Sequence, residues 1–288
     1  MPFKNLIHVI DPDTAAGSAA AYAAGLARAH QAHLTGLVIE LEPGMPVHAS
    51  ASVAVAAGLT EVDMRLWEQM QEREKERAEK AAEAFKGAVD SADLSVEVRR
   101  HVATGGDMPD VVAVNARHAD VSILPAPRDR DDFLGREVIE ETLFSSGRPV
   151  IVVPEGSSAA ADAKTVVIGW DGGREAARAV NDAMPILEKA QTVYVVTIDA
   201  QATRDGVGAD PGADISTHLA RHGVKVTLEH RESSGLSIGE ALAEAAKGLG
   251  ADIVVMGGYG HSRMRQMILG GTTRTLLDMP PLPVFLSH

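Results

Sequence analysis

Glycines and threonines near the C-terminus of the chain form a pattern that suits the binding of an anion. A first cluster, Gly257-Gly258-Tyr259-Gly260, directly follows an apolar run, and a second, Gly270-Gly271-Thr272-Thr273, opens a predicted short helix. Glycine lets the backbone approach a ligand because no Cβ intervenes, and the N–H groups at a helix N-terminus attract phosphate. In the alternative interpretation the glycines only make tight turns, and Thr272 caps the helix.

Two well-known phosphate-binding motifs do not occur in this sequence. It has no G-K-[S/T] of a Walker A loop and no G-x-G-x-x-G at the first strand of a βαβ unit. No catalytic pair of carboxylates stands out, so any hydrolysis would depend on a metal-activated water and would be slow. The sequence therefore favours ligand binding over turnover.

Metal ligands are also sparse. There is no cysteine, which excludes disulfides, thiolate metal sites and cysteine nucleophiles. His218 and His222 are four residues apart on a predicted helix and could share one face, but no third ligand accompanies them. We expect no protein-built metal site.

Charge and hydropathy exclude further classes. The chain has 288 residues, with 40 Asp and Glu against 27 Lys and Arg, for a net charge of −13. Such a surface repels nucleic acid and anionic lipid unless it contains a local basic patch. No apolar run is long enough to span a membrane, and the N-terminus does not resemble a signal peptide. We expect a cytoplasmic protein without a nucleic acid or membrane partner.

The elements that would position the glycines form a repeat of strands and helices. Apolar runs predict strands at 6–10, 33–40, 94–102, 119–124 and 149–153, and again at 165–170, 192–198, 224–230, 251–256 and 283–286. Helical segments such as 15–29, 107–117, 174–187, 237–249 and 272–278 alternate with them. This alternation predicts two doubly wound α/β domains with open parallel sheets, whose ligands bind where the strand order reverses.

Two further segments lie outside this repeat. Residues 155–163 are small and polar and predict a linker, which gives domains at 1–155 and 164–288. Residues 61–89 predict a long charged helix with one apolar stripe at Met64, Trp67 and Met70 and a solvated opposite face.

The spacing Gly257-x2-Gly260-x9-Gly270 resembles the nucleotide-binding signature of the universal stress protein family, G-2x-G-9x-G-[S/T]. The run from Ala251 to Gly257 and the strand-end Asp171 are similar to that family too. The resemblance covers nearly the whole chain as two tandem domains. It implies five-stranded sheets with the strand order 3-2-1-4-5, one in each domain. One departure is that Gly271 stands where ATP-binding members usually have Ser or Thr.

The resemblance also implies a set of ligand contacts in the second domain. It places Asp171 by the adenine and ribose of ATP, and Thr197 at the end of strand 2 as an adenine contact. Met256 ends strand 4 beside the crevice. The residues that would surround ribose and phosphates are Gly257, Gly260, Gly270, Gly271 and Thr272. A carboxylate suits a ribose or amine donor, although Asp171 in a D-G-G sequence could equally make a turn or cap a helix.

The first half lacks the glycine loop. Its corresponding stretch, residues 125–135, has prolines without N–H donors and several aspartates that would repel phosphate, although Asp11 still ends the first strand. We expect this half to be degenerate for nucleotide and to serve packing, pairing with the second half, or another ligand; the resemblance implies that such pairing uses the two final strands. Whether the chain also forms a homodimer is left open.

The sequence and the resemblance together predict a stress-response protein that binds ATP, with Mg²⁺ or Mn²⁺, in its second domain as a regulatory ligand. Little or no hydrolysis is expected. The alternative is a scaffold or interaction protein that has kept the fold and lost the ligand.

Overall fold

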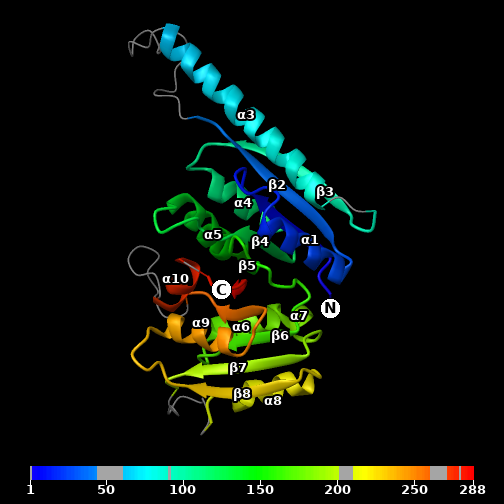
Figure 1. Cartoon of the computed structure of the whole chain (residues 1–288), viewed down its shortest axis with the longest axis vertical. Coiled ribbons are helices and arrows are strands. Elements are labelled where there is room, and N and C mark those ends of the chain that lie inside the picture. Colours follow the sequence, from blue (N-terminus) through cyan, green and yellow to red (C-terminus); the bar gives the residue numbers. More distant parts are fainter. Residues whose placement is uncertain (1, 44–60, 90–91, 201–209, 260–270, 279) are drawn as a thin grey trace.

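The computed structural model describes residues 2–43, 61–89, 92–200, 210–259, 271–278 and 280–288. Strands and helices alternate in both halves, as predicted (Figure 1). The first half contains β1 (Asn5–Ile10), α1 (Ser18–His30), β2 (His33–Leu41), α3 (Glu61–Val89), β3 (Val96–Ala103), α4 (Met108–Ala116), β4 (Val121–Pro125), α5 (Phe133–Ser145) and β5 (Val150–Val153). The second half contains β6 (Thr165–Gly169), α6 (Arg174–Asp182), α7 (Met184–Leu187), β7 (Thr192–Ile198), α8 (Ala213–Arg221), β8 (Val226–Arg231), α9 (Ile238–Gly248), β9 (Ile253–Gly257), α10 (Gly271–Asp278) and β10 (Val284–Ser287).

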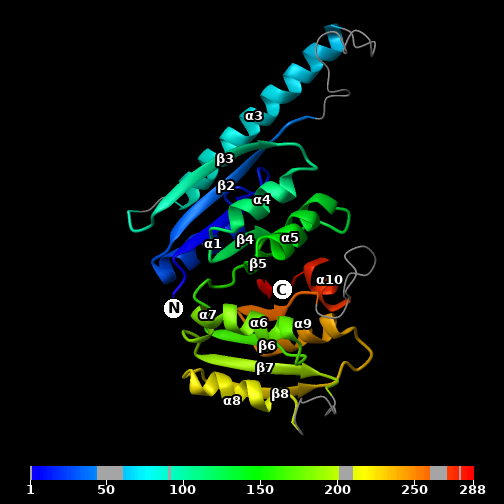
Figure 2. The ribbon, with the colours of Figure 1, turned by 180° about the vertical axis from the view of Figure 1, so that it is seen from behind.

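The described strands form one ten-stranded sheet with the order β3-β2-β1-β4-β5-β10-β9-β6-β7-β8. Each half has the predicted order 3-2-1-4-5, and its strand pairs are parallel. The two five-stranded sheets are joined by the antiparallel pair β5 and β10, in which Ile151 lies opposite Phe285. The halves are therefore stacked along the long axis of the molecule (Figures 1 and 2).

The joining strands explain why the sheet continues across the halves. Both are short, rich in β-branched or large apolar residues, and buried along their whole length. Each would otherwise be an apolar edge strand with unpaired backbone groups, which is an aggregation hazard in water. Pairing β5 with β10 satisfies both edges at once.

Helices cover both faces of the sheet, and each face has a hydrophobic core that includes residues of both halves. On one face the core contains residues of α1, α3, α6, α7 and α8, together with Ile151 and Phe285 at the joint. On the other it contains residues of α4, α5, α9 and α10 with Val152 and Val284. The chain is thus built in three layers.

Helix α3 has the predicted bounds, and Met64 and Trp67 of the predicted apolar stripe are half-buried, whereas Met70 is 44% exposed. The fully buried residues of this helix are Ala78, Ala81, Phe85 and Val89. The reason is visible in Figure 1: the C-terminal part of α3 lies on the sheet, and its N-terminal part extends beyond it. The ring of Phe85 packs so closely on Gly36 of β2 that a Cβ there would lie 2.4 Å from a ring carbon.

The predicted single helix at 174–187 is two helices. Helix α6 ends at Asp182, and α7 begins at Met184, one residue before Pro185. Proline has no N–H to donate to the preceding turn, so it is tolerated at a new helix start and not inside a continuous helix. No helix in the described ranges is both long and apolar enough to cross a membrane.

Candidate functional site

In the second half, the strand order reverses between β6 and β9, where ligands of doubly wound sheets usually bind. The parallel register places Gly169 of β6 opposite Val196 of β7 and opposite Met256 of β9. Thr197 and Gly257 come one residue later, so both lie at the same carboxyl edge of the sheet. Asp171 follows β6 at this edge.

Asp171 shapes the turn that leads into α6. Its Oδ1 accepts a hydrogen bond of 2.7 Å from the backbone N–H of Gly173, directly before α6 begins at Arg174. Gly172, between them, has a φ of +77° that suits glycine. The structure therefore shows Asp171 making the turn before α6, whereas its contact with a nucleotide stays a prediction.

Gly257 has a packing reason to be glycine. A Cβ at this position would lie 2.5 Å from the backbone nitrogen of Ala176 and 2.6 Å from the backbone carbonyl carbon of Glu175. The first turn of α6 therefore rests directly on the end of β9. Met256, the residue before, is a buried core residue.

Helix α10 begins near the end of β9. The hydroxyl of Thr273 accepts a hydrogen bond of 3.2 Å from the backbone N–H of Tyr259, which fixes the first turn of the helix to the chain after β9. Gly271 is the exposed first residue of α10, and Thr272 follows it, half-buried. Gly260 and Gly270, the two remaining predicted contacts, lie outside the described residues.

Thr197 is buried, and its hydroxyl is already engaged. Its Oγ1 lies 2.7 Å from Nδ1 of His230, the residue opposite it on β8, and Nε2 of His230 lies 2.9 Å from Oδ1 of Asp210. The structure thus brings Asp171, Thr197 and the end of β9 to one edge of the sheet. The Thr197 hydroxyl, however, already has a partner within the protein, His230.

The chain after β9 also joins the two halves, which the sequence analysis missed. Tyr259 is buried with a φ of +60°, and its hydroxyl donates a hydrogen bond of 3.0 Å to Glu140 of α5. Its ring lies against Phe144, with centroids 5.0 Å apart. Burial raises the pKa of Glu140, and burial together with the nearby Glu140 carboxyl raises the pKa of Tyr259.

The predicted histidine pair does not build a metal site. The rings of His218 and His222 lie 4.7 Å apart. Within the part of the chain that the structure describes, no group of three His, Asp or Glu side chains could hold a metal ion.

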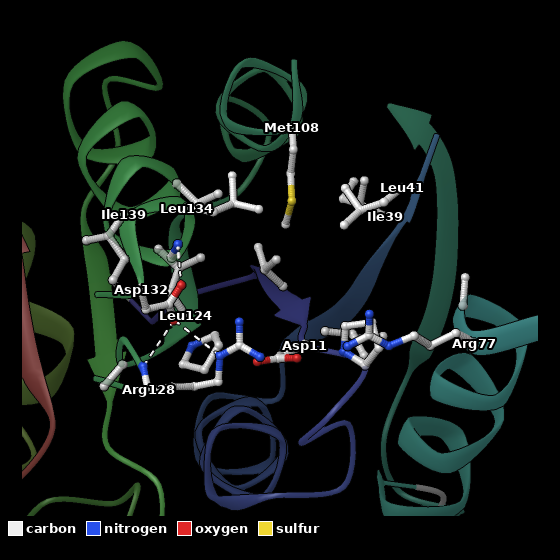
Figure 3. Close-up of a pocket in the computed structure, with 18 of the residues that line it drawn as sticks. Asp11, Ile39, Leu41, Arg77, Met108, Leu124, Arg128, Asp132, Leu134 and Ile139 are labelled. Atoms are coloured by element: carbon white, nitrogen blue, oxygen red, sulfur yellow. Dashed lines mark hydrogen bonds and ion pairs between the residues drawn. The ribbon is translucent and has the colours of Figure 1, made fainter. Parts of the chain in front are cut away.

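A pocket lies at the corresponding position of the first half, where the strand order reverses between β1 and β4 (Figure 3). Its cavity has a volume of about 140 Å³. The lining is mostly apolar and comes from the ends of β1, β2 and β4 and from α3, α4 and α5; it includes Ile10, Ile39, Leu41, Ala78, Met108, Leu124, Ala126, Leu134, Val138 and Ile139.

One end of this pocket carries charged side chains. Asp11, Arg77, Arg128 and Asp132 lie there, opposite the apolar end with Met108 in Figure 3. The sequence analysis singled out Asp11 but missed both arginines. Arg77 lies in the charged helix α3 and Arg128 among the aspartates after β4, and nothing in their local sequence indicates that they face one pocket.

Comparisons with known proteins agree with this architecture. A model of the universal stress protein family matches residues 162–288. A universal stress protein from Archaeoglobus fulgidus DSM 4304 is similar in structure, with a TM-score of 0.66, 15% identity, and 98% of this chain and 95% of that chain covered. A functionally unknown protein from Pseudomonas aeruginosa PAO1 has a TM-score of 0.58 and 17% identity, with coverages of 99% and 92%. A comparison with curated proteins found no match.

The family match covers the half with the glycine clusters, and the structural similarity extends over both halves. Residues 162–288 therefore match the universal stress protein family, and the whole chain has a fold similar to that of a solved universal stress protein, with two similar halves joined in one sheet.

Proposed function

We propose that this chain is a stress-response protein whose C-terminal half binds ATP, together with Mg²⁺ or Mn²⁺, as a regulatory ligand. The observation that supports the proposal is the convergence at one carboxyl edge of Asp171, Thr197, Met256 and Gly257, beside the first turn of α10. This edge lies at the switch point of the sheet, and the residues come from separate strands.

Each part of the edge suits a different part of the nucleotide. The Asp171 carboxylate has the acceptor chemistry for ribose hydroxyls or an adenine amine. The N-terminus of α10 offers backbone N–H groups and a positive dipole end to phosphates. At Gly271, the first residue of this helix, a Cβ would meet no atom of the described residues within 4 Å. A bound cation would offset the repulsion between phosphates and a chain of net charge −13.

We further propose that the protein works as an intramolecular pair of domains, residues 1–155 and 164–288, in the cytoplasm. Supporting this division, β5 ends at Val153, β6 begins at Thr165, and β5 pairs with β10 across the joint. The nucleotide would act through occupancy, with little or no hydrolysis, because the sequence offers no pair of carboxylates suited to activating water.

Thermal unfolding of the nucleotide-stripped full chain tests this proposal. ATP at about 100 times its dissociation constant should stabilise the folded state by about 2.7 kcal/mol, which is a rise of roughly 5–10 °C in Tm. Asp171→Asn and Gly270→Val should reduce this rise, and the matched variant Asp11→Asn in the first half should keep it. No rise in the wild type, or a rise that depends on Asp11 and not on Asp171, would contradict the proposal.

A scaffold that has lost its nucleotide is the second candidate, and a specific observation favours it. The chain after β9 has a structural purpose of its own, since Tyr259 bonds Glu140, and a Cβ at Gly258 would lie 2.7 Å from Leu143 of the first half. A scaffold of this kind would show no nucleotide-dependent rise in Tm at millimolar ATP.

A further inference from the structure

The pocket of the first half differs in chemistry from a phosphate site. Pro12 and Pro125, at the ends of the two strands that flank the switch point, both line it and have no N–H to offer. Its deeper walls are apolar and almost fully buried, as at Ile39, Leu124 and Ile139. An interior of this kind accepts a compact apolar group.

The size of the cavity limits the ligand. A volume of about 140 Å³ is close to that of apolar protein cavities that bind benzene, which are roughly 150 Å³. One six-membered ring or a short aliphatic chain would fill it. Adenosine with three phosphates would not fit inside.

The charged end is the mouth of the pocket. The side chains of Arg77 and Arg128 are 39% and 58% exposed. Both guanidinium groups are already paired with Asp13, whose two oxygens lie 2.6 Å from Nη2 of Arg77 and 2.8 Å from Nη1 of Arg128. Arg128 also contacts Asp132 at 3.4 Å. An anionic ligand would therefore have to displace an internal carboxylate from both arginines.

The remaining charge at the mouth favours a positive head group. Among the described residues that line the pocket, the carboxylates of Asp11, Glu74 and Asp132 outnumber the guanidinium groups of Arg77 and Arg128, and Asp13 beside them adds a fourth carboxylate. The Asp11 carboxylate uses Oδ1 to accept a bond of 2.9 Å from the backbone N–H of Asp13. Its second oxygen has no hydrogen bond to any residue in the described ranges, which leaves it available to a donor.

We propose that the first half binds a small amine with a compact apolar body, such as one ring or a short aliphatic chain. The apolar body would lie among Ile39, Met108 and Leu134, and the ammonium group would bond to Asp11 at the mouth. This ligand differs from the nucleotide proposed for the second half, and the inference does not depend on that proposal.

Benzylamine and benzoate are suitable probes, because they share the ring and carry opposite charges. We expect calorimetric titration or ligand-observed NMR on the full chain to show one benzylamine per chain and at least tenfold weaker benzoate. Asp11→Asn keeps the acceptor for Asp13 and removes the charge, so it should weaken benzylamine by about tenfold or more. The matched variant Asp171→Asn, in the second half, should leave it unchanged.

A second variant tests the cavity without changing any charged residue. Ala126 lines the pocket and is half-buried, so Ala126→Leu should fill the cavity, abolish benzylamine binding, and keep or raise the melting temperature. Saturating ATP should not compete with benzylamine. The proposal is overturned if no benzylamine binds, if benzoate binds equally well, or if binding survives both Asp11→Asn and Ala126→Leu.

Discussion

Replacement of Gly257 by alanine should destabilise the chain in the absence of any nucleotide, because the added methyl group has no room. Its Cβ would lie 2.5 Å from the Ala176 nitrogen and 2.6 Å from the Glu175 carbonyl carbon, where carbon atoms in good contact keep ~3.5 Å. Both neighbours are backbone atoms in the first turn of α6, so they cannot rotate away as a side chain could. Either α6 or the end of β9 must move.

Overpacking of this kind costs about 1–3 kcal/mol. A loss of about 2 kcal/mol corresponds to a fall in Tm of roughly 4–8 °C for a chain of this size. The matched control is Gly271→Ala, at the first residue of α10, where a Cβ would meet no atom of the described part of the chain within 4 Å. Alanine there should be neutral or stabilise by about 0.4–1 kcal/mol, since it restricts the unfolded chain.

Urea unfolding and calorimetry of the two variants, both stripped of nucleotide, measure the difference. If Gly257 is needed only for close approach of a ligand, Gly257→Ala will unfold at the wild-type urea concentration. That result would refute the packing argument. A loss in Gly271→Ala as large as that in Gly257→Ala would refute it as well.

Two further predictions concern buried polar groups. Burial lowers the pKa of His8 to about 4, and its Nδ1 lies 3.1 Å from the Ile123 carbonyl. In the unfolded chain the histidine pKa is about 6.5, so protonation below that pH favours unfolding. The free energy of unfolding should therefore fall by about 2 kcal/mol between pH 7 and pH 5. His8→Asn should flatten this pH dependence in urea titrations. Tyr259→Phe removes the bond to Glu140 and should cost about 1–2 kcal/mol in the same assay. Tyr194→Phe, whose hydroxyl has no hydrogen bond among the described residues, should cost nothing measurable, and an equal loss in both variants would exclude the Glu140 bond as the cause.

The fold was largely predictable because its strands are apolar runs that alternate with helical segments. The runs at 6–10 and 165–170 end at Asp11 and Asp171, and the structure has strands at both places. The position of the carboxyl edge of the second-half sheet, near Asp171, was also predictable from the sequence, because parallel strands of a doubly wound sheet end on the same side.

Features that depend on contacts between distant segments could not be predicted in this way. The buried residues of α3 near Phe85 were not predicted, because the sequence does not show which turns of a long helix lie on the sheet. The bond from Tyr259 to Glu140 joins residues of different halves, and local sequence carries no sign of it. The charged mouth of the first pocket brings Arg77 and Arg128 to Asp13 from two separate segments.

Calorimetric titration of ATP with Mg²⁺ into the nucleotide-stripped full chain is the most direct test of the central claim. One site per chain, lost in Gly270→Val and retained in Asp11→Asn, is the predicted result. Two sites per chain would contradict the degenerate first half. The absence of binding heat at several temperatures, with no shift in Tm, would contradict nucleotide binding altogether.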